Sequence, residues 1–190
     1  MRKKLLQVLP IFLSFTLLAS CSDGSTASAL DSSPVTDACA CDVISPKDFK
    51  FTTLDDGRCS VSISDENAVS LEIPSHSPDG QEVKVIGRIK CPKLVDVTLP
   101  DTAEEIGDWA FDECTKLVSV DIPDSVNVIG EEGFYRCYQL KSVHLPAGVK
   151  ADSCAFSHCV NLVDINMEDI GEFIGDGVFY DCFSLKKNNI

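Results

Sequence analysis

The C-terminal half of the chain predicts a solenoid of short stacked coils. Five cysteines recur there at spacings of 23, 23, 22 and 23 residues: Cys91, Cys114, Cys137, Cys159 and Cys182. A Phe stands three residues before the cysteine in four units (Phe111, Phe134, Phe156, Phe179), and a Leu stands three residues after it in all five (Leu94, Leu117, Leu140, Leu162, Leu185). Repeats with a period of roughly 20 to 50 residues are typical of solenoids and related arrays.

Each unit is expected to contain one strand and one return segment. In the copy CTKLVSVDIPDSVNVIGEEGF, Val120 and Ile122 alternate with polar residues at the period of a strand with one buried face. Pro123 ends this strand because proline has no N–H to donate to a ladder. Ile129 then begins a second extended segment or turn, and the turn before the next cysteine has room for at most one helical turn. We therefore expect a right-handed stack of coils, each a strand plus a return turn or a short 3-10 or β segment.

The third coil departs from this pattern. The third coil lacks one residue between Pro146 and Phe156, and it carries Ala151 where its neighbours carry Ile129 or Ile174. A smaller side chain and a shorter connection predict a kink or a weakened return segment at this position.

The phrases LVSVDIPDSVNVIG, LKSVHLPAGV and IGDWAFDECTKL resemble the BspA-like leucine-rich repeat family, the 23-residue bacterial type. The resemblance covers about residues 83–190. It implies a leucine-rich-repeat solenoid that binds partners and has no catalytic activity. Residues 49–75, with alternating Cys59, Val61 and Ile63, resemble the β-hairpin that often precedes the first full repeat in this family and would cap the N-terminal coil.

The first twenty residues have the pattern of a secretory signal peptide. Three basic residues at 2–4 precede an apolar run at 5–19, which is too short to span a membrane. The run ends in Leu-Ala-Ser-Cys21, which resembles the bacterial lipobox, so we expect a lipid on Cys21. Two or three acyl chains anchor a protein stably. The alternative is an ordinary signal peptide in which Cys21 is incidental.

Residues 21–48 are expected to be a flexible tether. The stretch SDGSTASALDSSPVTDA is small, polar and almost free of large apolar residues, so it cannot bury enough surface to fold. The domain order predicted from the sequence is therefore a signal peptide (1–20), a lipidated tether (21–48), a β cap (49–82) and leucine-rich repeats (83–190).

The chain is strongly acidic. Its net charge is −14, and it becomes −17 once the three basic residues of the signal are removed. Nucleic acid and anionic membrane surfaces are therefore disfavoured as partners, and contact with the membrane is expected through the lipid anchor alone. A basic or neutral partner is favoured, although the acidity also serves simply to keep a surface protein soluble.

The repeat cysteines are expected to be free and buried as small hydrophobic side chains. Neighbours 23 residues apart form a line rather than a tetrahedron, so no metal site is predicted. Outside the ladder, Cys39 or Cys41 could form a disulfide with Cys59, or these thiols and Cys154 could be free.

The sequence gives no sign of catalysis or of a cofactor. Its three histidines, His76, His144 and His158, lie in no metal-binding or nucleophile motif. His158 precedes Cys159, but it occupies a variable repeat position that is expected to be exposed surface.

The candidate binding surface is the outer face of the repeated strands. Residues that alternate with the buried positions point outward and would form a ladder of small polar and acidic groups, of the kind that solenoids use for partners. The alternative is that they are only solvated. They are Asp96, Thr98, Ser119, Asp121, Ser142, His144, Asp164 and Asn166. Aromatic side chains in or near the Phe turn (Trp109, Tyr135, Tyr138 and Tyr180) are a second candidate, with partial burial equally expected for Trp109.

These features predict a lipid-anchored protein of the bacterial envelope, placed on the outer membrane and facing the cell exterior. The resemblance implies adhesion to, or recognition of, host proteins, other cells or glycans. The alternative is a periplasm-facing structural or assembly lipoprotein that binds an envelope partner.

Overall fold

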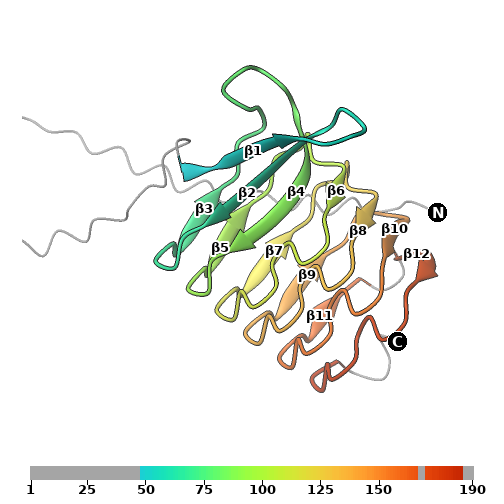
Figure 1. Cartoon of the computed structure of the whole chain (residues 1–190). Helices are drawn as coiled ribbons and strands as arrows, with labels where there is room; N and C mark the ends of the chain where they lie inside the picture. The colour runs from blue at the N-terminus through green and yellow to red at the C-terminus, as the bar shows by residue number, and fades with distance from the viewer. Residues whose placement is uncertain (1–47, 167–169, 186–190) are drawn as a thin grey trace, which may run out of the picture. The chain divides into compact units, whose positions relative to one another are not determined.

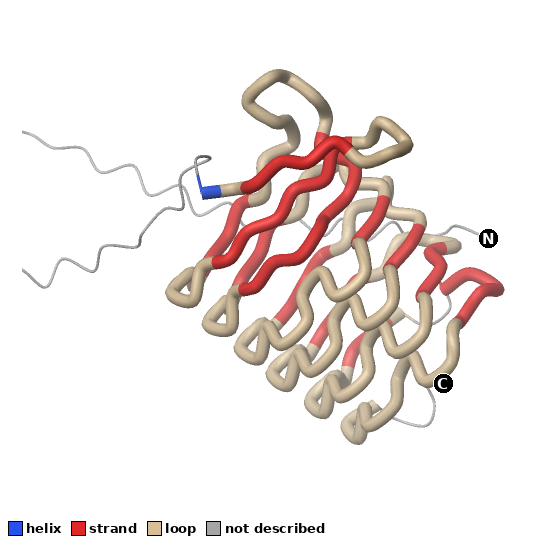
Figure 2. Tube along the Cα trace, in the orientation of Figure 1, coloured by secondary structure: helices blue, strands red, loops and turns tan. Residues whose placement is uncertain are grey.

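The computed structural model describes residues 48–166 and 170–185, which form a β-solenoid of stacked coils (Figure 1). Strands and turns alternate along it, and no α-helix occurs in these two ranges (Figure 2). No helix within them is long and apolar enough to cross a membrane. The predicted signal peptide, Cys21 and all of the predicted tether except Asp48 lie outside the described residues.

One side of the solenoid carries the repeated strands predicted from the cysteine and leucine spacing. Each has a buried central or final residue between exposed or half-buried ones, as the period-two pattern predicts. β3 pairs in parallel with β5, and β7, β9 and β11 pair in parallel in that order. Between β5 and β7 the Val118 N–H donates to Val95 O at 3.2 Å. These strands are β3 (Ser70–Glu72), β5 (Asp96–Thr98), β7 (Ser119–Asp121), β9 (Ser142–His144) and β11 (Asp164–Ile165).

The return segment of each coil is also a strand. Its members pair in parallel and, with β1, make a seven-stranded sheet in the order β1-β2-β4-β6-β8-β10-β12. The sequence did not distinguish between a strand, a turn and a 3-10 segment for the return segment, because stretches such as Glu105–Ile106 are too short to show a period. They are β2 (Cys59–Ser64), β4 (Val83–Lys90), β6 (Glu105–Ile106), β8 (Val128–Ile129), β10 (Val149–Ala151) and β12 (Ile170–Ile174).

The N-terminal cap is a β-hairpin, as the family resemblance implied. β1 (Lys50–Thr53) pairs with β2 in antiparallel register, from Lys50 opposite Ser62 to Thr53 opposite Cys59. β2 in turn pairs in parallel with β4. The hairpin therefore covers an edge that would otherwise present unpaired backbone groups, and cap and coils form one compact unit.

The irregularity expected at Ala151 lies on one side of β10 only. β10 keeps regular register with β8, where Ala151 is opposite Ile129, but its register with β12 shifts between Val149 and Ala151. Ala151 is buried like Ile129, whereas Ile174 is 51% exposed. The smaller side chain thus stays in the core, and the irregularity lies in the register between β10 and β12.

The turns that lead into each cysteine form a third ladder between coils. Two positions in each turn, two residues before and two after the Phe, have left-handed φ angles between 53° and 65°. In the first three turns their N–H groups donate to carbonyls of the next coil, for example Trp109 to Glu131 at 2.9 Å and Arg136 to Ser157 at 3.0 Å. A left-handed residue costs about 1 to 2 kcal/mol, which such hydrogen bonds help to offset. The positions are Trp109, Glu113, Glu132, Arg136, Cys154, His158, Gly177 and Asp181.

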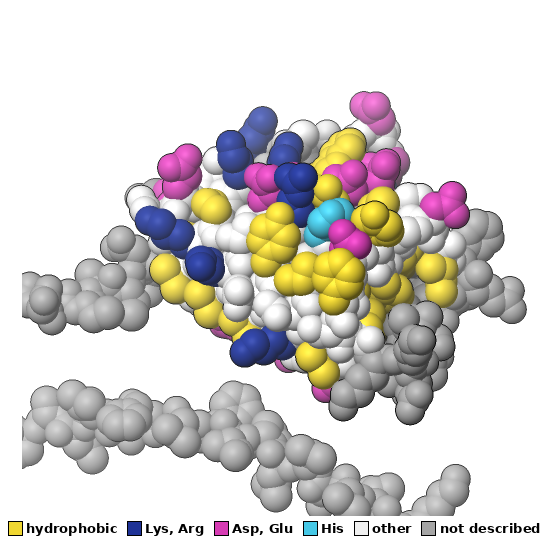
Figure 3. Space-filling view, turned by 90° about the horizontal axis from the view of Figure 1, so that it is seen from below, with side chains coloured by type: hydrophobic (Ala, Val, Ile, Leu, Met, Phe, Trp, Pro, Cys, Tyr) yellow, Lys and Arg dark blue, Asp and Glu magenta, His cyan; other side chains and the backbone are white. Residues whose placement is uncertain are grey.

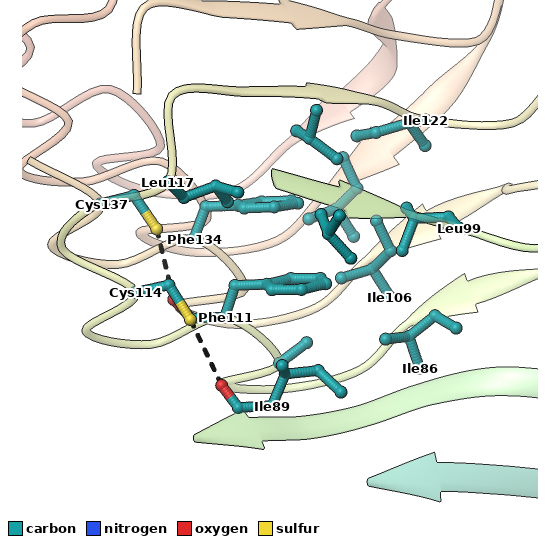
Figure 4. Close-up of a cluster of buried hydrophobic side chains, with 14 of the residues drawn as sticks. Ile86, Ile89, Leu99, Ile106, Phe111, Cys114, Leu117, Ile122, Phe134 and Cys137 are labelled. Atoms are coloured by element: carbon teal, nitrogen blue, oxygen red, sulfur yellow. Dashed lines mark hydrogen bonds between the residues drawn. The ribbon is translucent and has the colours of Figure 1, made fainter. Parts of the chain in front are cut away.

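Beneath the turns lies a column of stacked phenylalanine rings. The ring centroids of Phe111 and Phe134 are 5.0 Å apart, and those of Phe134 and Phe156 are 5.1 Å apart. The buried cysteines run alongside (Figure 4). Cys114 Sγ donates to Ile89 O at 3.3 Å and Cys137 Sγ to Phe111 O at 3.2 Å. Each thiol therefore fills space in its own coil and hydrogen-bonds to the coil before it.

The thiol ladder can be tested by Cys137→Ala. Cys137 is fully buried, so the change leaves a small cavity and removes the thiol hydrogen bond to the Phe111 carbonyl, which keeps its bond from the Cys114 N–H at 3.1 Å. We expect the free energy of unfolding to fall by about 1 to 3 kcal/mol. The matched control is Cys154→Ala, because Cys154 is half-buried and its Sγ lies 3.8 Å from Asp176 O. Urea denaturation measures both. Equal losses in the two variants would mean that the ladder position has no special role.

Candidate functional site: two surfaces of the solenoid

The polar residues predicted to face outward from the repeated strands do so. Six of them are exposed and the other two, Ser142 and Asn166, are half-buried. Parallel pairing places Asp121 opposite His144 and Ser142 opposite Asp164. The exposed members are Asp96, Thr98, Ser119, Asp121, His144 and Asp164.

The C-terminal part of this face is hollowed into a shallow groove. Strands β7, β9 and β11 and the residue after β11 line a volume of about 240 Å³ with Asp121, Ser142, Val143, His144, Asp164 and Asn166. Carboxylates, an imidazole and a hydroxyl on neighbouring strands offer several hydrogen-bond acceptors and a few donors. We call this surface the strand-face groove.

Asn166 has a structural role that the sequence did not reveal. Its Oδ1 accepts from the Leu145 N–H at 2.8 Å, and its Nδ2 donates to the Leu145 carbonyl at 2.8 Å. Because β11 ends at Ile165, this side-chain amide takes the place of the next backbone pair in the ladder. Asn166 therefore borders the groove but uses both amide atoms within the fold.

The turns form a second candidate binding surface, on the side seen in Figure 3. Hydrophobic and charged side chains lie there around a histidine. The aromatic residues predicted near the Phe turn are largely accessible: Trp109 is 43%, Tyr138 38% and Tyr180 61% exposed, while Tyr135 is half-buried. Trp109 is therefore exposed, the first of the two expectations for it, rather than partly buried. Exposed aromatic side chains are common in binding hot spots.

A groove of about 350 Å³ lies between these turns, which we call the turn-side groove. Its charged residues were missed by the sequence reasoning, although aligning the coils at their 23-residue period would have placed them in neighbouring turns. Burial, followed by the negative charge of Glu113, raises the pKa of Asp112, while Arg88 acts in the opposite direction. The lining residues are Arg88, Trp109, Asp112, Glu113, Glu132, Tyr135 and Arg136.

His158 is less exposed than the surface residue expected from its variable position. It is half-buried between the rings of Tyr135 and Tyr180. Its Nδ1 lies 2.8 Å from Ser157 Oγ and its Nε2 3.5 Å from Asp181 Oδ2. This Ser-His-Asp contact is unsuited to nucleophilic catalysis, because Ser157 is only 1% exposed and a substrate carbonyl could not reach its oxygen. The contacts instead hold the imidazole in place.

The cysteines of the described residues are free thiols. This includes buried Cys59; Cys39 and Cys41, the partners considered for it, lie outside the described residues. Burial raises the pKa of Cys114 to about 12 and that of Cys182 to about 11, and it raises the pKa of Cys137 and Cys159 well above the usual thiol value. Neutral thiols are poor nucleophiles and poor metal ligands, and no cluster of three or more metal-binding side chains occurs among the residues described.

The raised thiol pKa values predict a loss of stability at alkaline pH. The thiols ionise near pH 9 in the unfolded chain but at a higher pH in the folded one, so their contribution is complete below pH 9 and falls above it. Each thiol should change the unfolding equilibrium constant by roughly tenfold per pH unit in this range. Urea denaturation between pH 8 and 10.5 measures the slope. In Cys137→Ala the free energy of unfolding should fall less steeply with pH, because one fewer thiol ionises on unfolding. An unchanged slope would contradict the raised pKa of Cys137.

The fold and its two surfaces define a leucine-rich-repeat solenoid, a scaffold that generally mediates protein binding rather than catalysis. The chain belongs to the family described as BspA type leucine rich repeat region, whose six matched copies span residues 89–190.

Solved structures of bacterial leucine-rich repeat proteins are similar to this chain. A leucine-rich repeat protein from Bacteroides ovatus is 29% identical with a TM-score of 0.51, and the match covers 76% of this chain and 45% of that one. The leucine-rich repeat protein of T. pallidum (TpLRR) is 25% identical with a TM-score of 0.47, covering 77% and 92%. A leucine rich cell surface protein from Faecalibacterium prausnitzii is 25% identical with a TM-score of 0.49, covering 73% and 52%. No curated protein matches the chain by sequence.

Proposed function

We propose that this protein is a lipid-anchored recognition module of the bacterial cell surface, which binds a protein or glycan ligand without catalysing a reaction. The observation that carries the proposal is the strand-face groove, where three neighbouring coils present polar side chains on a parallel sheet. Extended surfaces of this kind are what repeat solenoids use for partners. Adhesion to host proteins or to other cells is the role that fits such a module on a cell surface.

The anchor is proposed from the N-terminal sequence. A basic segment, an apolar run and Leu-Ala-Ser-Cys21 together support export followed by lipidation of Cys21. A polar stretch after Cys21 would then give the solenoid reach beyond the membrane surface. In the second candidate function the same module faces the periplasm and holds an envelope protein, which the same anchor and groove support equally.

Ligand capture through the strand-face groove can be tested by Asp121→Lys combined with His144→Lys. Both side chains are exposed, so we expect capture of matrix proteins or glycans to be lost while the melting temperature stays within about 2 °C. The matched control is Asp152→Lys with Asn127→Lys, which introduces the same charge at exposed positions flanking the return strands. Binding to an immobilised ligand array measures capture. Full capture by the strand-face variant would place the ligand elsewhere.

Exposure on the cell can be tested by brief protease treatment of intact cells, followed by blotting for this protein and for a periplasmic marker. We expect this protein to be digested while the marker stays intact. A Cys21→Ser variant should lose its membrane association and enter the soluble fraction, because it cannot receive the lipid. Protection of the native protein alongside an intact marker would favour the periplasm-facing alternative.

A further inference from the structure

The turn-side groove is built from three consecutive coils. Arg88 comes from β4, Trp109 from the following turn, and Glu132 from the turn after it. Trp109 and Glu132 occupy the same repeat position, two residues before the stacked phenylalanines, so the ladder places them in neighbouring turns. Both have left-handed φ angles, of 53° and 55°.

The charges in this groove largely cancel. Arg88 Nη2 lies 2.9 Å from Asp112 Oδ2, and Arg136 Nη1 lies 3.0 Å from Glu113 Oε1. Both arginines are therefore committed to carboxylates. Among the described residues no ion pair involves Glu132, so the charge left uncompensated in the groove is negative.

The two aromatic rings of the groove differ in whether a cation already lies beside them. The Arg136 guanidinium lies 4.8 Å from the centroid of the Tyr135 ring, so this ring already has a cation beside it. Trp109 has no such neighbour in the part of the chain that the structure describes, and 43% of it is exposed. Its backbone is fixed by the hydrogen bond to Glu131 O at 2.9 Å. A ring held on a rigid backbone loses little conformational entropy when a ligand binds.

We propose that the turn-side groove is a second binding site, which takes a lysine or arginine side chain from a basic segment of a protein partner. The cation would lie over the indole of Trp109 and pair with the carboxylate of Glu132. Tryptophan is the best aromatic partner for such cations, and the net charge of −14 attracts a basic segment over longer range. This site goes beyond the ligand capture proposed for the strand face, on a different surface.

The chain offers a direct readout because Trp109 is its only tryptophan. The probe is hexa-arginine amide, titrated into the mature protein at low salt with hexaserine amide as the uncharged peptide. We expect a saturable change in tryptophan emission with hexa-arginine alone, weakened by 0.3 M salt because exposed charges are screened. An absent change, or an equal change with hexaserine, would overturn the proposal.

Matched variants separate a specific site from diffuse attraction. Glu132→Gln should weaken hexa-arginine binding by about threefold to fivefold, the upper part of the range of one exposed ion pair. Glu131→Gln makes the same change in the next residue, which does not line the groove, and should bind within about twofold of the native protein. Equal loss in both variants would overturn the site, since it would show that only net charge matters.

A labelled hexa-arginine peptide followed by anisotropy allows Trp109 itself to be changed. Trp109→Ala should weaken binding by about tenfold, and Asp152→Asn, at an exposed position outside both grooves, should have no effect. Circular dichroism confirms that each variant is folded. If chitohexaose shifts the Trp109 emission while hexa-arginine does not, the groove binds neutral glycans and the proposal for a basic segment is wrong.

Discussion

Hydrogen bonding between successive coils is the interaction on which the rest of this structure depends. A coil of about 23 residues has too little apolar surface to offset its own conformational entropy, so it is stable only when stacked. Three ladders provide the stacking: the repeated strands, the return strands and the turns. The stacked phenylalanines and the thiols that donate to the preceding coil then fill the space that these ladders enclose.

Stacking also determines what the surface can present. A side chain at a given repeat position lies next to its counterpart in the following coil, so the surface consists of columns whose chemistry can change one coil at a time. The position two residues before the Phe carries Trp109, Glu132, Cys154 and Gly177 in succession. The backbone conformation stays the same while the side chain differs, which allows binding chemistry to change without a change in the core.

The sequence predicted the repeated strands well because one side chain in two must be buried, and this leaves a visible alternation around Val120 and Val143. It could not decide the return strands, whose pairs of residues have no period and become strands only through hydrogen bonds to neighbouring coils. The outward residues of the strand face followed from the same alternation. The double amide contact of Asn166 did not, because it depends on β11 ending at Ile165. The turn-side groove depends on side-chain pairing across turns, such as Arg88 with Asp112, which a single unit cannot show.

The direction of β1 has a consequence for how such proteins change in length during evolution. Every other strand of the large sheet runs parallel to its neighbour, whereas β1 runs antiparallel to β2 and ends the parallel series. A duplicated coil inserted after the cap finds a parallel edge on each side and continues all three ladders. The same coil placed before the cap would meet an antiparallel strand with no matching turn. Gene duplication can therefore lengthen the array only downstream of the hairpin, which makes the N-terminal end the fixed origin from which the repeats are counted.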